Sequence, residues 1–268
     1  MANVLHIDSS PRADGESHSR ELSKTFVSAW RAAHPDDAIA TRDLSQPETP
    51  VPHVNEAWIA AYGKLRAFTP PEEHTDEQKQ ALALSDELVD QFLAADKIVF
   101  GTPMYNFNIP STLKAYIDHI VRVGKTFSYD AKGQPRGLLE GKKAIVITAR
   151  GGDYSAESPA AAMDFATPYL KTILGGFIGI EDVTFVNANG LALDDEAAAA
   201  DASEQTLAEA IAAIQDAVAA WAQVWAAADL AAAAARKLAA AAIKGALEDK
   251  ELAAKAYRAA LSREDAEG

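Results

Sequence analysis

The chain has 268 residues, of which 49% are hydrophobic, and it carries a formal net charge of −14 at pH 7. This length and composition are typical of a globular chain with one substantial core, and the negative charge argues against nucleic acid or an anionic membrane surface as a partner. The sequence contains no cysteine, which excludes disulfides, thiolate catalysis and Cys-ligated metal sites.

The N-terminus and the hydropathy of the chain bear on its location. Residues 1–6 contain no basic region followed by a long apolar run, and no span of about 18 bulky apolar residues occurs later. We therefore expect a cytoplasmic protein without a membrane partner. We also expect no metal site.

A short apolar segment, Val4–Asp8, predicts a first strand that leads into a hydroxyl-rich loop over residues 9–19. A segment with apolar side chains at helical spacing follows. Serine hydroxyls and free backbone N–H groups at the start of a helix form a suitable phosphate cradle, and Arg12 adds positive charge. The alternative is that Ser17 or Ser19 only caps the helix, which is the commoner role.

Residues 38–43 predict a second strand, and an irregular, proline-containing segment follows over residues 46–71. A long segment of this kind is usually functional or packs on a partner. A helix then starts at Thr75 or Asp76 and leads into the next strand. Strands and helices therefore alternate as they do in parallel α/β folds.

The third predicted strand begins at Lys97 and ends in a loop rich in Pro, Tyr and Asn, before a helix over residues 112–123 that Ser111 caps. Residues 104–107, Met-Tyr-Asn-Phe, offer flat apolar faces, a side-chain amide and free backbone N–H groups. In a parallel sheet, ligands bind where strands end in this way, and this mixture suits a planar heteroaromatic ring. The alternative is an ordinary strand-to-helix turn whose aromatic side chains lie in the core.

The fourth predicted strand, residues 143–149, follows a loop or small hairpin over residues 125–137. It ends in the run Ala149-Arg-Gly-Gly-Asp153. The two glycines let the backbone approach a ligand closely, and Arg150 supplies positive charge. A simple tight turn is the alternative interpretation.

A helix over residues 164–174, a connector over 175–179 and a fifth strand over 183–186 complete the pattern. The predicted fold class is α/β, a flavodoxin-like doubly wound sheet of five parallel strands with helices on both faces. In this strand order, the loops after the first, third and fourth strands share one edge of the sheet. A phosphate cradle, a ring platform and a Gly-Gly loop at one crevice are the parts needed to hold FMN. The G-x-G-x-x-G turn of most NAD sites is absent after the first strand.

Several short segments carry a resemblance to a known family. They are Ser9-Ser10, Ser17-His18-Ser19, Pro103-Met-Tyr-Asn-Phe-Asn-Ile109, residues 141–148, Arg150-Gly-Gly152, Thr167-Pro-Tyr-Leu170 and residues 176–180. Through them the chain resembles the FMN-dependent NADH-azoreductase and quinone reductase family of bacteria, over residues 1–222. The chain departs from the family at Asp153 and Tyr154, where a residue such as His is frequent, and by one extra glycine at Gly175-Gly176. These departures leave the substrate preference open.

The resemblance implies a homodimeric flavoprotein that uses FMN, with NADH or NADPH as electron donor. It implies that the FMN phosphate and ring are held by Ser10, Ser17, His18, Ser19, Pro103, Met104, Tyr105, Asn106, Phe107, Ala149, Arg150, Gly151 and Gly152. Phe127, Tyr129 and Phe177 match aromatic positions that wall the substrate pocket in the family. As lone aromatics they are equally consistent with core or dimer contacts.

The activity implied by the resemblance is a ping-pong reaction. NAD(P)H reduces the flavin at N5 and leaves, and a quinone or azo compound then takes the electrons in the same slot. No catalytic side chain is required, and the backbone N–H groups of Asn106, Phe107, Gly151 and Gly152 are expected to stabilise the anionic reduced flavin. Two alternatives stay open, a flavodoxin-type electron carrier and an assembly scaffold built on this domain.

The composition changes after a predicted helix over residues 203–225. We therefore expect a flavodoxin-like FMN-binding catalytic domain over residues 1–225 and an alanine-rich extension over 226–268, which is either lineage-specific or engineered. Its high helix propensity predicts a helical extension with a turn between Gly245 and Asp249. Because alanine surfaces bury little area, we expect this extension to make contacts between chains, and further self-assembly through it stays open. The alternative to the turn is a straight helix paired with another chain.

Overall fold

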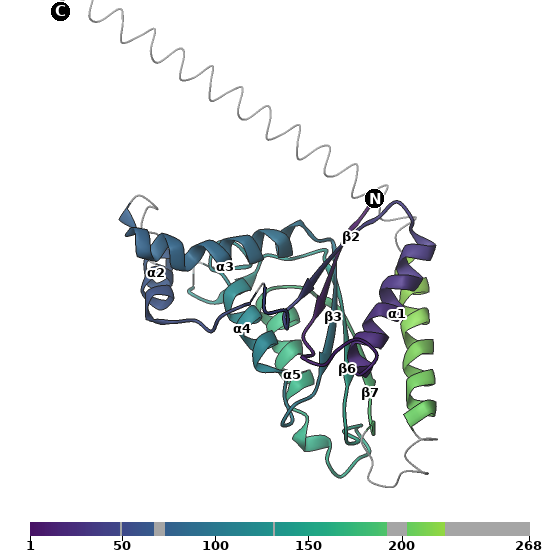
Figure 1. The fold of residues 1–268 in the computed structure, drawn as a ribbon. Helices are drawn as coiled ribbons and strands as arrows, with labels where there is room; N and C mark the ends of the chain where they lie inside the picture. The colour runs from purple at the N-terminus through teal and green to yellow at the C-terminus, as the bar shows by residue number, and fades with distance from the viewer. Residues whose placement is uncertain (49, 67–72, 131, 192–202, 223–268) are drawn as a thin grey trace, which may run out of the picture. The chain divides into compact units, whose positions relative to one another are not determined.

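The structure is a computed structural model, and it describes residues 1–48, 50–66, 73–130, 132–191 and 203–222. Its centre is a sheet of five parallel strands in the order β2-β1-β3-β6-β7, which confirms the predicted flavodoxin-like fold (Figure 1). The strands are β1 (Asn3–Asp8), β2 (Ala38–Asp43), β3 (Lys97–Pro103), β6 (Lys143–Ala149) and β7 (Asp182–Ala188).

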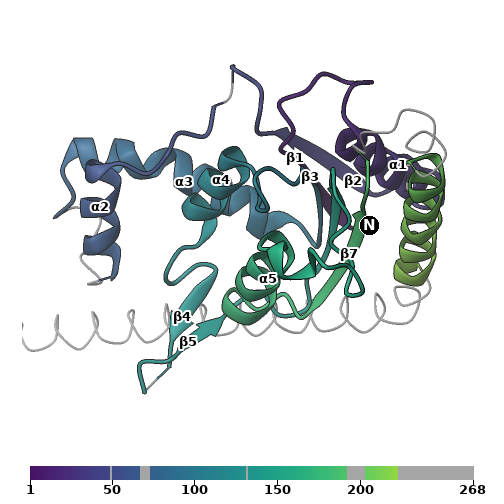
Figure 2. The same ribbon diagram turned by 90° about the horizontal axis from the view of Figure 1, so that it is seen from below.

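Helices cover both faces of the sheet (Figure 1). The named helices are α1 (His18–Ala33), α2 (Glu56–Arg66), α3 (Asp76–Ala94), α4 (Ser111–Ile120) and α5 (Ala166–Leu170). One face carries α1, beside which helical residues 203–218 lie in both views, and the other face carries α3, α4 and α5 (Figures 1 and 2). A small hairpin of β4 (Phe127–Tyr129) and β5 (Pro135–Gly137) projects from the body (Figure 2).

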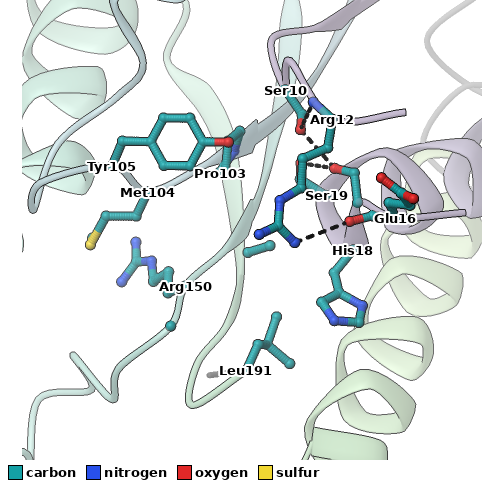
Figure 3. Close-up of a pocket in the computed structure, with 13 residues that line it drawn as sticks. Ser10, Arg12, Glu16, His18, Ser19, Pro103, Met104, Tyr105, Arg150 and Leu191 are labelled. Carbon is teal, nitrogen blue, oxygen red and sulfur yellow. Dashed lines mark hydrogen bonds between the residues drawn. The ribbon is translucent and has the colours of Figure 1, made fainter. Parts of the chain in front are cut away.

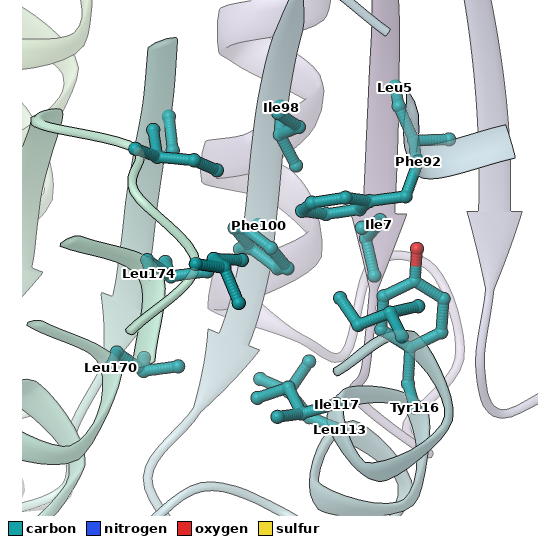
Figure 4. Packing of buried hydrophobic residues seen from close by; sticks show 14 of the residues in the cluster. Leu5, Ile7, Phe92, Ile98, Phe100, Leu113, Tyr116, Ile117, Leu170 and Leu174 are labelled. Atoms are coloured by element: carbon teal, nitrogen blue, oxygen red, sulfur yellow. The ribbon is translucent and has the colours of Figure 1, made fainter. Parts of the chain in front are cut away.

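The main core lies between the sheet and α3, α4 and α5 (Figure 4). Leu5 and Ile7 of β1 and Ile98 and Phe100 of β3 point to this face and are almost fully buried. Side chains alternate along a strand, so Val99, which is also buried, faces α1. Burial on both faces explains why the parallel strands read as nearly continuous apolar runs.

We had expected residues 46–71 to be irregular, but this segment contains the helix α2. The Asn55 side chain accepts a hydrogen bond from the Trp58 N–H at 2.9 Å at the start of this helix. Trp58 and Ala61 then pack against Leu82 of α3 and form a small second core. Burial of this apolar stripe stabilises a helix that its own propensity would leave marginal.

The helix starts predicted at Thr75 and Ser111 have different outcomes. Thr75 caps α3 as expected: its hydroxyl accepts from Gln78 N at 3.2 Å, and the Gln78 side chain accepts from Thr75 N at 3.1 Å. Ser111 is instead the first residue of α4, and the cap position is Pro110, which makes no side-chain cap bond. The prediction that Ser111 caps this helix was wrong, because the fixed φ of Pro110 already sets the helix entry.

The predicted helix over residues 164–174 and its connector form one continuous helical segment. After α5 the chain widens into a π-helix over Lys171–Phe177, in which Ile178 N donates to Ile173 O, five residues earlier, at 3.0 Å. Wide turns of this kind are rare and occur mostly inside α-helices, frequently at functional sites. Gly175 and Gly176, which we had predicted in a connector, therefore belong to the helical segment.

The chain divides into two compact units, Met1–Val218 and Ala219–Gly268. The predicted extension over residues 226–268 lies outside the described residues, and the helix before it is observed over residues 203–222. In the described part of the chain, no helix combines the length and apolar character that crossing a bilayer requires.

Substitution of Gly101 tests the close contact between β1 and β3. A Cβ added to Gly101 would collide with the Asp8 carboxylate and lie 2.6 Å from Ser23 Oγ. We expect Gly101→Ala to lower the free energy of unfolding by about 2 kcal/mol or more, measured by urea denaturation. Gly63→Ala in α2, where a Cβ meets nothing within 4 Å, is the control and should be neutral or stabilising. An unchanged unfolding midpoint for Gly101→Ala would contradict the packing described.

Candidate functional site

Three serine hydroxyls meet at the N-terminus of α1 and form the serine cradle, Ser10, Ser17 and Ser19. Figure 3 labels Ser10 and Ser19 of this group. Ser17 Oγ donates to Ser10 Oγ at 2.8 Å and lies 3.2 Å from Ser19 Oγ. Ser17 is also the N-cap of α1, since its side chain accepts from Arg20 N. The capping role and the cradle are therefore compatible at this residue. The positive end of the α1 dipole lies at the same point.

Two basic side chains flank the serine cradle. Arg12 crosses its mouth and donates from Nη1 to the Glu16 carbonyl at 3.3 Å (Figure 3). The His18 side chain is 45% exposed, and its Nδ1 lies 3.9 Å from Glu21 Oε2. Both side chains line the same cleft as the serines. Hydroxyls, a helix N-terminus and basic groups together suit a phosphate group.

The loop after β3 is a tight turn with a strained backbone. Tyr105 N donates to Asn108 O at 2.9 Å and Asn108 N donates to Tyr105 O at 3.0 Å. The two residues between them, Asn106 and Phe107, have φ values of 48° and 68°. This is a two-residue hairpin turn with two left-handed residues, a conformation that costs energy for a phenylalanine. Strain of this kind is concentrated at functional sites.

The loop after β6 is fastened to both neighbouring loops by backbone hydrogen bonds. Met104 N donates to Ala149 O at 2.9 Å. On the other side, Leu191 N donates to Arg150 O and Gly190 N donates to Gly152 O, both at 3.0 Å. The loops after β3, β6 and β7 are therefore held as one rim.

The Arg150 side chain does not supply free charge to the cleft, and this corrects our expectation. Its guanidinium donates to Asp164 at 3.0 Å, Thr167 at 2.5 Å, Asn187 at 2.9 Å and Thr148 at 3.0 Å, and the side chain is 1% exposed. Burial acts to raise the pKa of Asp164, but hydrogen bonds from Thr167 and Arg150 outweigh it, so the pKa lies below its ordinary value. A buried guanidinium needs such partners, so its charge is neutralised within the protein.

One cleft of about 220 Å³ joins these parts. Its lining residues are Ser10, Arg12, Glu16, Ser17, His18, Ser19, Pro103, Met104, Tyr105, Ala149, Arg150, Gly151 and Leu191. Asn106, Phe107 and Gly152, which we expected in the site, lie beside this lining and not in it. Glu16 and Leu191 were missed. The signal for Leu191 was its place after the fifth strand, because all parallel strands end at the same edge.

The expected substrate-pocket aromatics form a separate aromatic cluster of Phe127, Tyr129 and Phe177. The Phe127 ring lies 4.6 Å from the Phe177 ring and 5.6 Å from the Tyr129 ring, centroid to centroid. Phe127 is buried, whereas Tyr129 is 44% exposed. None of the three lines the cleft of its own chain.

Comparison with known proteins places this geometry in a family. A family model with the flavodoxin-like fold matches residues 2–216. An FMN-dependent NADH:quinone oxidoreductase from Nostoc punctiforme is 67% identical over 221 residues, which are 82% of this chain and 100% of the relative.

Solved structures agree with this match. A Bacillus anthracis azoreductase is 33% identical with a TM-score of 0.71, covering 81% of this chain and 100% of its own. An FMN-dependent NADH-azoreductase from the same species, solved in complex with FMN, is 29% identical with a TM-score of 0.71, covering 83% of this chain and 100% of its own. The chain therefore belongs to the family with the flavodoxin-like fold that includes these FMN-dependent NADH:quinone oxidoreductases.

Proposed function

We propose that the chain is an FMN-dependent NADH:quinone oxidoreductase that also reduces azo compounds. The observation that carries the proposal is the meeting of the serine cradle, the end of β3 and the loop after β6 in one cleft. The name of the relative that is 67% identical over its whole length supports the quinone reaction, and the azoreductase structures support the azo compounds. Use of NADPH in place of NADH and a cytoplasmic location are further parts of this proposal.

The residues of the cleft fit FMN. Hydroxyls at the N-terminus of α1 offer donors to a terminal phosphate, Arg12 offers charge beside it, and His18 offers a ring nitrogen. At the other end, Tyr105 and Gly151 flank a space that an aromatic ring can enter. A phosphate and a flat ring joined by a flexible chain therefore match the two ends of the cleft.

When bound, FMN supplies hydride transfer between the nicotinamide donor and the acceptor. The chain orients the ring and stabilises negative charge at its edge. The backbone N–H groups of Asn106, Phe107, Gly151 and Gly152 have no backbone acceptor among the described residues, so they can donate to that edge. In this proposal no side chain acts as a nucleophile.

A ping-pong order is part of the same proposal. The nicotinamide donor and the acceptor must both reach the flavin ring, and one cleft joins the parts of the site that would hold it. We therefore expect the donor and the acceptor to use the same position beside the ring in turn.

Exposed apolar side chains beside the cleft support a homodimer. Tyr105 and Phe107 are each 38% exposed, Met163 is 40% exposed and Phe165 is 56% exposed, and Phe165 N donates to Phe107 O at 3.0 Å. In a two-fold dimer, one chain can bring the exposed Tyr129 of its aromatic cluster to the cleft of the other, whereas Phe127 stays buried in its own chain. Further self-assembly through residues 226–268 stays a proposal about residues outside the described part.

Titration with flavins tests the cofactor. We expect one FMN per chain and at least about tenfold weaker binding of FAD, because the serine cradle suits a terminal phosphate. Ser10→Ala should raise the Kd for FMN about fivefold to tenfold by removing one hydroxyl partner. Ser28→Ala, on the exposed side of α1, is the control and should leave it unchanged. Protein that binds no FMN in this titration would rule the cofactor out.

Steady-state kinetics test the order of the reaction. NADH oxidation at several fixed concentrations of menadione should give parallel double-reciprocal lines, because donor and acceptor occupy one position in turn. Intersecting lines would indicate that both substrates bind together. Bound FMN without sustained NADH oxidation would instead favour an electron carrier.

Mixed dimers test the contribution of the aromatic cluster in trans. Asn106→Ala and Tyr129→Ala should each lower kcat/KM for the quinone. When the two impaired variants are unfolded, mixed and refolded together, about a quarter of all sites should be intact, because half of the dimers are mixed and each mixed dimer has one complete site. If the mixture shows no more activity than the separate variants, Tyr129 does not complete the site of another chain, and this part of the proposal is wrong.

A further inference from the structure

We infer that Arg20 is a positioning residue for the phosphate end of the cleft, acting through the main chain of Ser10 and through a clamp on Asp43. The inference rests on the proposed FMN function and concerns a residue that does not line the cleft. Two observations carry it, the hydrogen bonds of the guanidinium and the buried carboxylates that it faces.

The Arg20 guanidinium fixes one wall of the serine cradle. Arg20 lies in the first turn of α1 and is 5% exposed. Its Nε and Nη2 donate to the Ser10 carbonyl at 3.1 Å and 2.6 Å. The hydroxyl of the same Ser10 accepts from Ser17 Oγ inside the cradle. The guanidinium therefore sets where the Ser10 hydroxyl stands.

On its other side, the Arg20 guanidinium binds Asp43, the last residue of β2. Nη2 donates to Asp43 Oδ1 at 2.8 Å, and Nη1 lies 2.7 Å from Asp43 Oδ2, which is a bidentate pair. Asp43 also accepts from Ser45 N at 2.9 Å and from the Gln46 side chain at 2.8 Å. Burial acts to raise the pKa of Asp43, but the hydrogen bonds from Arg20, Gln46 and Ser45 hold it well below its ordinary value. Asp43 is thus a fixed anionic anchor.

Arg20 also lies close to a second buried carboxylate, that of Asp8. Its Nη1 lies 3.7 Å from Asp8 Oδ2, and Asp8 is only 2% exposed. Without Arg20, Asp8 and Asp43 would lose their nearest guanidinium and would repel a phosphate held at Ser10. This repulsion acts on a phosphate and hardly on a neutral ring. Loss of Arg20 should therefore weaken FMN far more than riboflavin.

The position of Arg20 shows that it acts indirectly. It borders a second cavity of about 700 Å³, whose lining includes Asp14, Lys24 and Asp43 but none of the cradle serines. Its acceptors lie in two directions, Ser10 O on one side and the Asp43 carboxylate on the other. A planar guanidinium can serve both at once, whereas a lysine ammonium keeps the charge but loses the fork.

The test compares FMN with riboflavin, which has the same ring and no phosphate. Both are titrated by flavin fluorescence into the wild-type chain, Arg20→Gln and Arg20→Lys. Arg20→Gln should raise the Kd for FMN about tenfold or more and the Kd for riboflavin less than about twofold, and Arg20→Lys should lie between it and the wild type. Asp43→Asn, which keeps the size of the side chain, is the second variant and decides the matter if Arg20→Gln does not fold. It should raise the Kd for FMN about threefold with little change for riboflavin, because the weaker clamp on Arg20 outweighs the loss of one repelling carboxylate.

Arg42→Gln is the matched control, because Arg42 lies on β2 beside Asp43. Arg42 donates to Gln91 at 2.7 Å and to Glu87 at 2.6 Å, on α3 at the opposite face of the sheet, so neither flavin should bind differently. Equal weakening of FMN and riboflavin by Arg20→Gln would mean a purely structural role and overturn the inference, as would an unchanged Kd for FMN. A wild-type chain that does not bind FMN would overturn the proposed function and this inference together.

Discussion

The parallel register of β1, β3 and β6 is the constraint on which the rest of the structure depends. Asp8 pairs with Gly101, and Gly101 pairs with Ile147, so the three strands end at nearly the same level. The loops that follow them must therefore meet at one edge. A side chain at position 101 would push β1 and α1 away from β3, because Asp8 and Ser23 occupy that space. The cleft exists because this close contact is kept.

Buried guanidinium groups hold the loops at that edge in place. Arg20 joins the serine loop to the end of β2, and Arg150 joins the loop after β6 to Asp164 and to Asn187 of β7. An unpaired charge inside a protein is costly, so each guanidinium keeps its partners and each loop keeps its place. Arg20 and Arg150 thus organise the loops, and the serine hydroxyls line the cleft together with Arg12 and Glu16.

Sequence patterns were sufficient where the signal is local. Apolar runs followed by polar or turn-forming residues predicted the five strands, the serine loop and the loop after β3. The order of the strands in the sheet followed from right-handed crossovers. Contacts between distant segments were harder. The helix over Glu56–Arg66 depends on packing of Trp58 against Leu82, and Arg150 was misjudged because its partners Asp164 and Asn187 come from other elements. For Phe127 and Tyr129 the sequence left a substrate pocket, the core and a dimer contact open, because a lone aromatic residue carries no local pattern that separates these roles; in the structure Phe127 is buried and Tyr129 is exposed.

The most direct test of the account is a crystal structure of the chain grown with FMN. We predict that the FMN phosphate contacts the hydroxyls of Ser10, Ser17 and Ser19, that Arg20 stays bound to Ser10 and Asp43, and that the ring lies between Tyr105 and Gly151. FMN bound elsewhere, or with its phosphate away from the N-terminus of α1, would contradict the site.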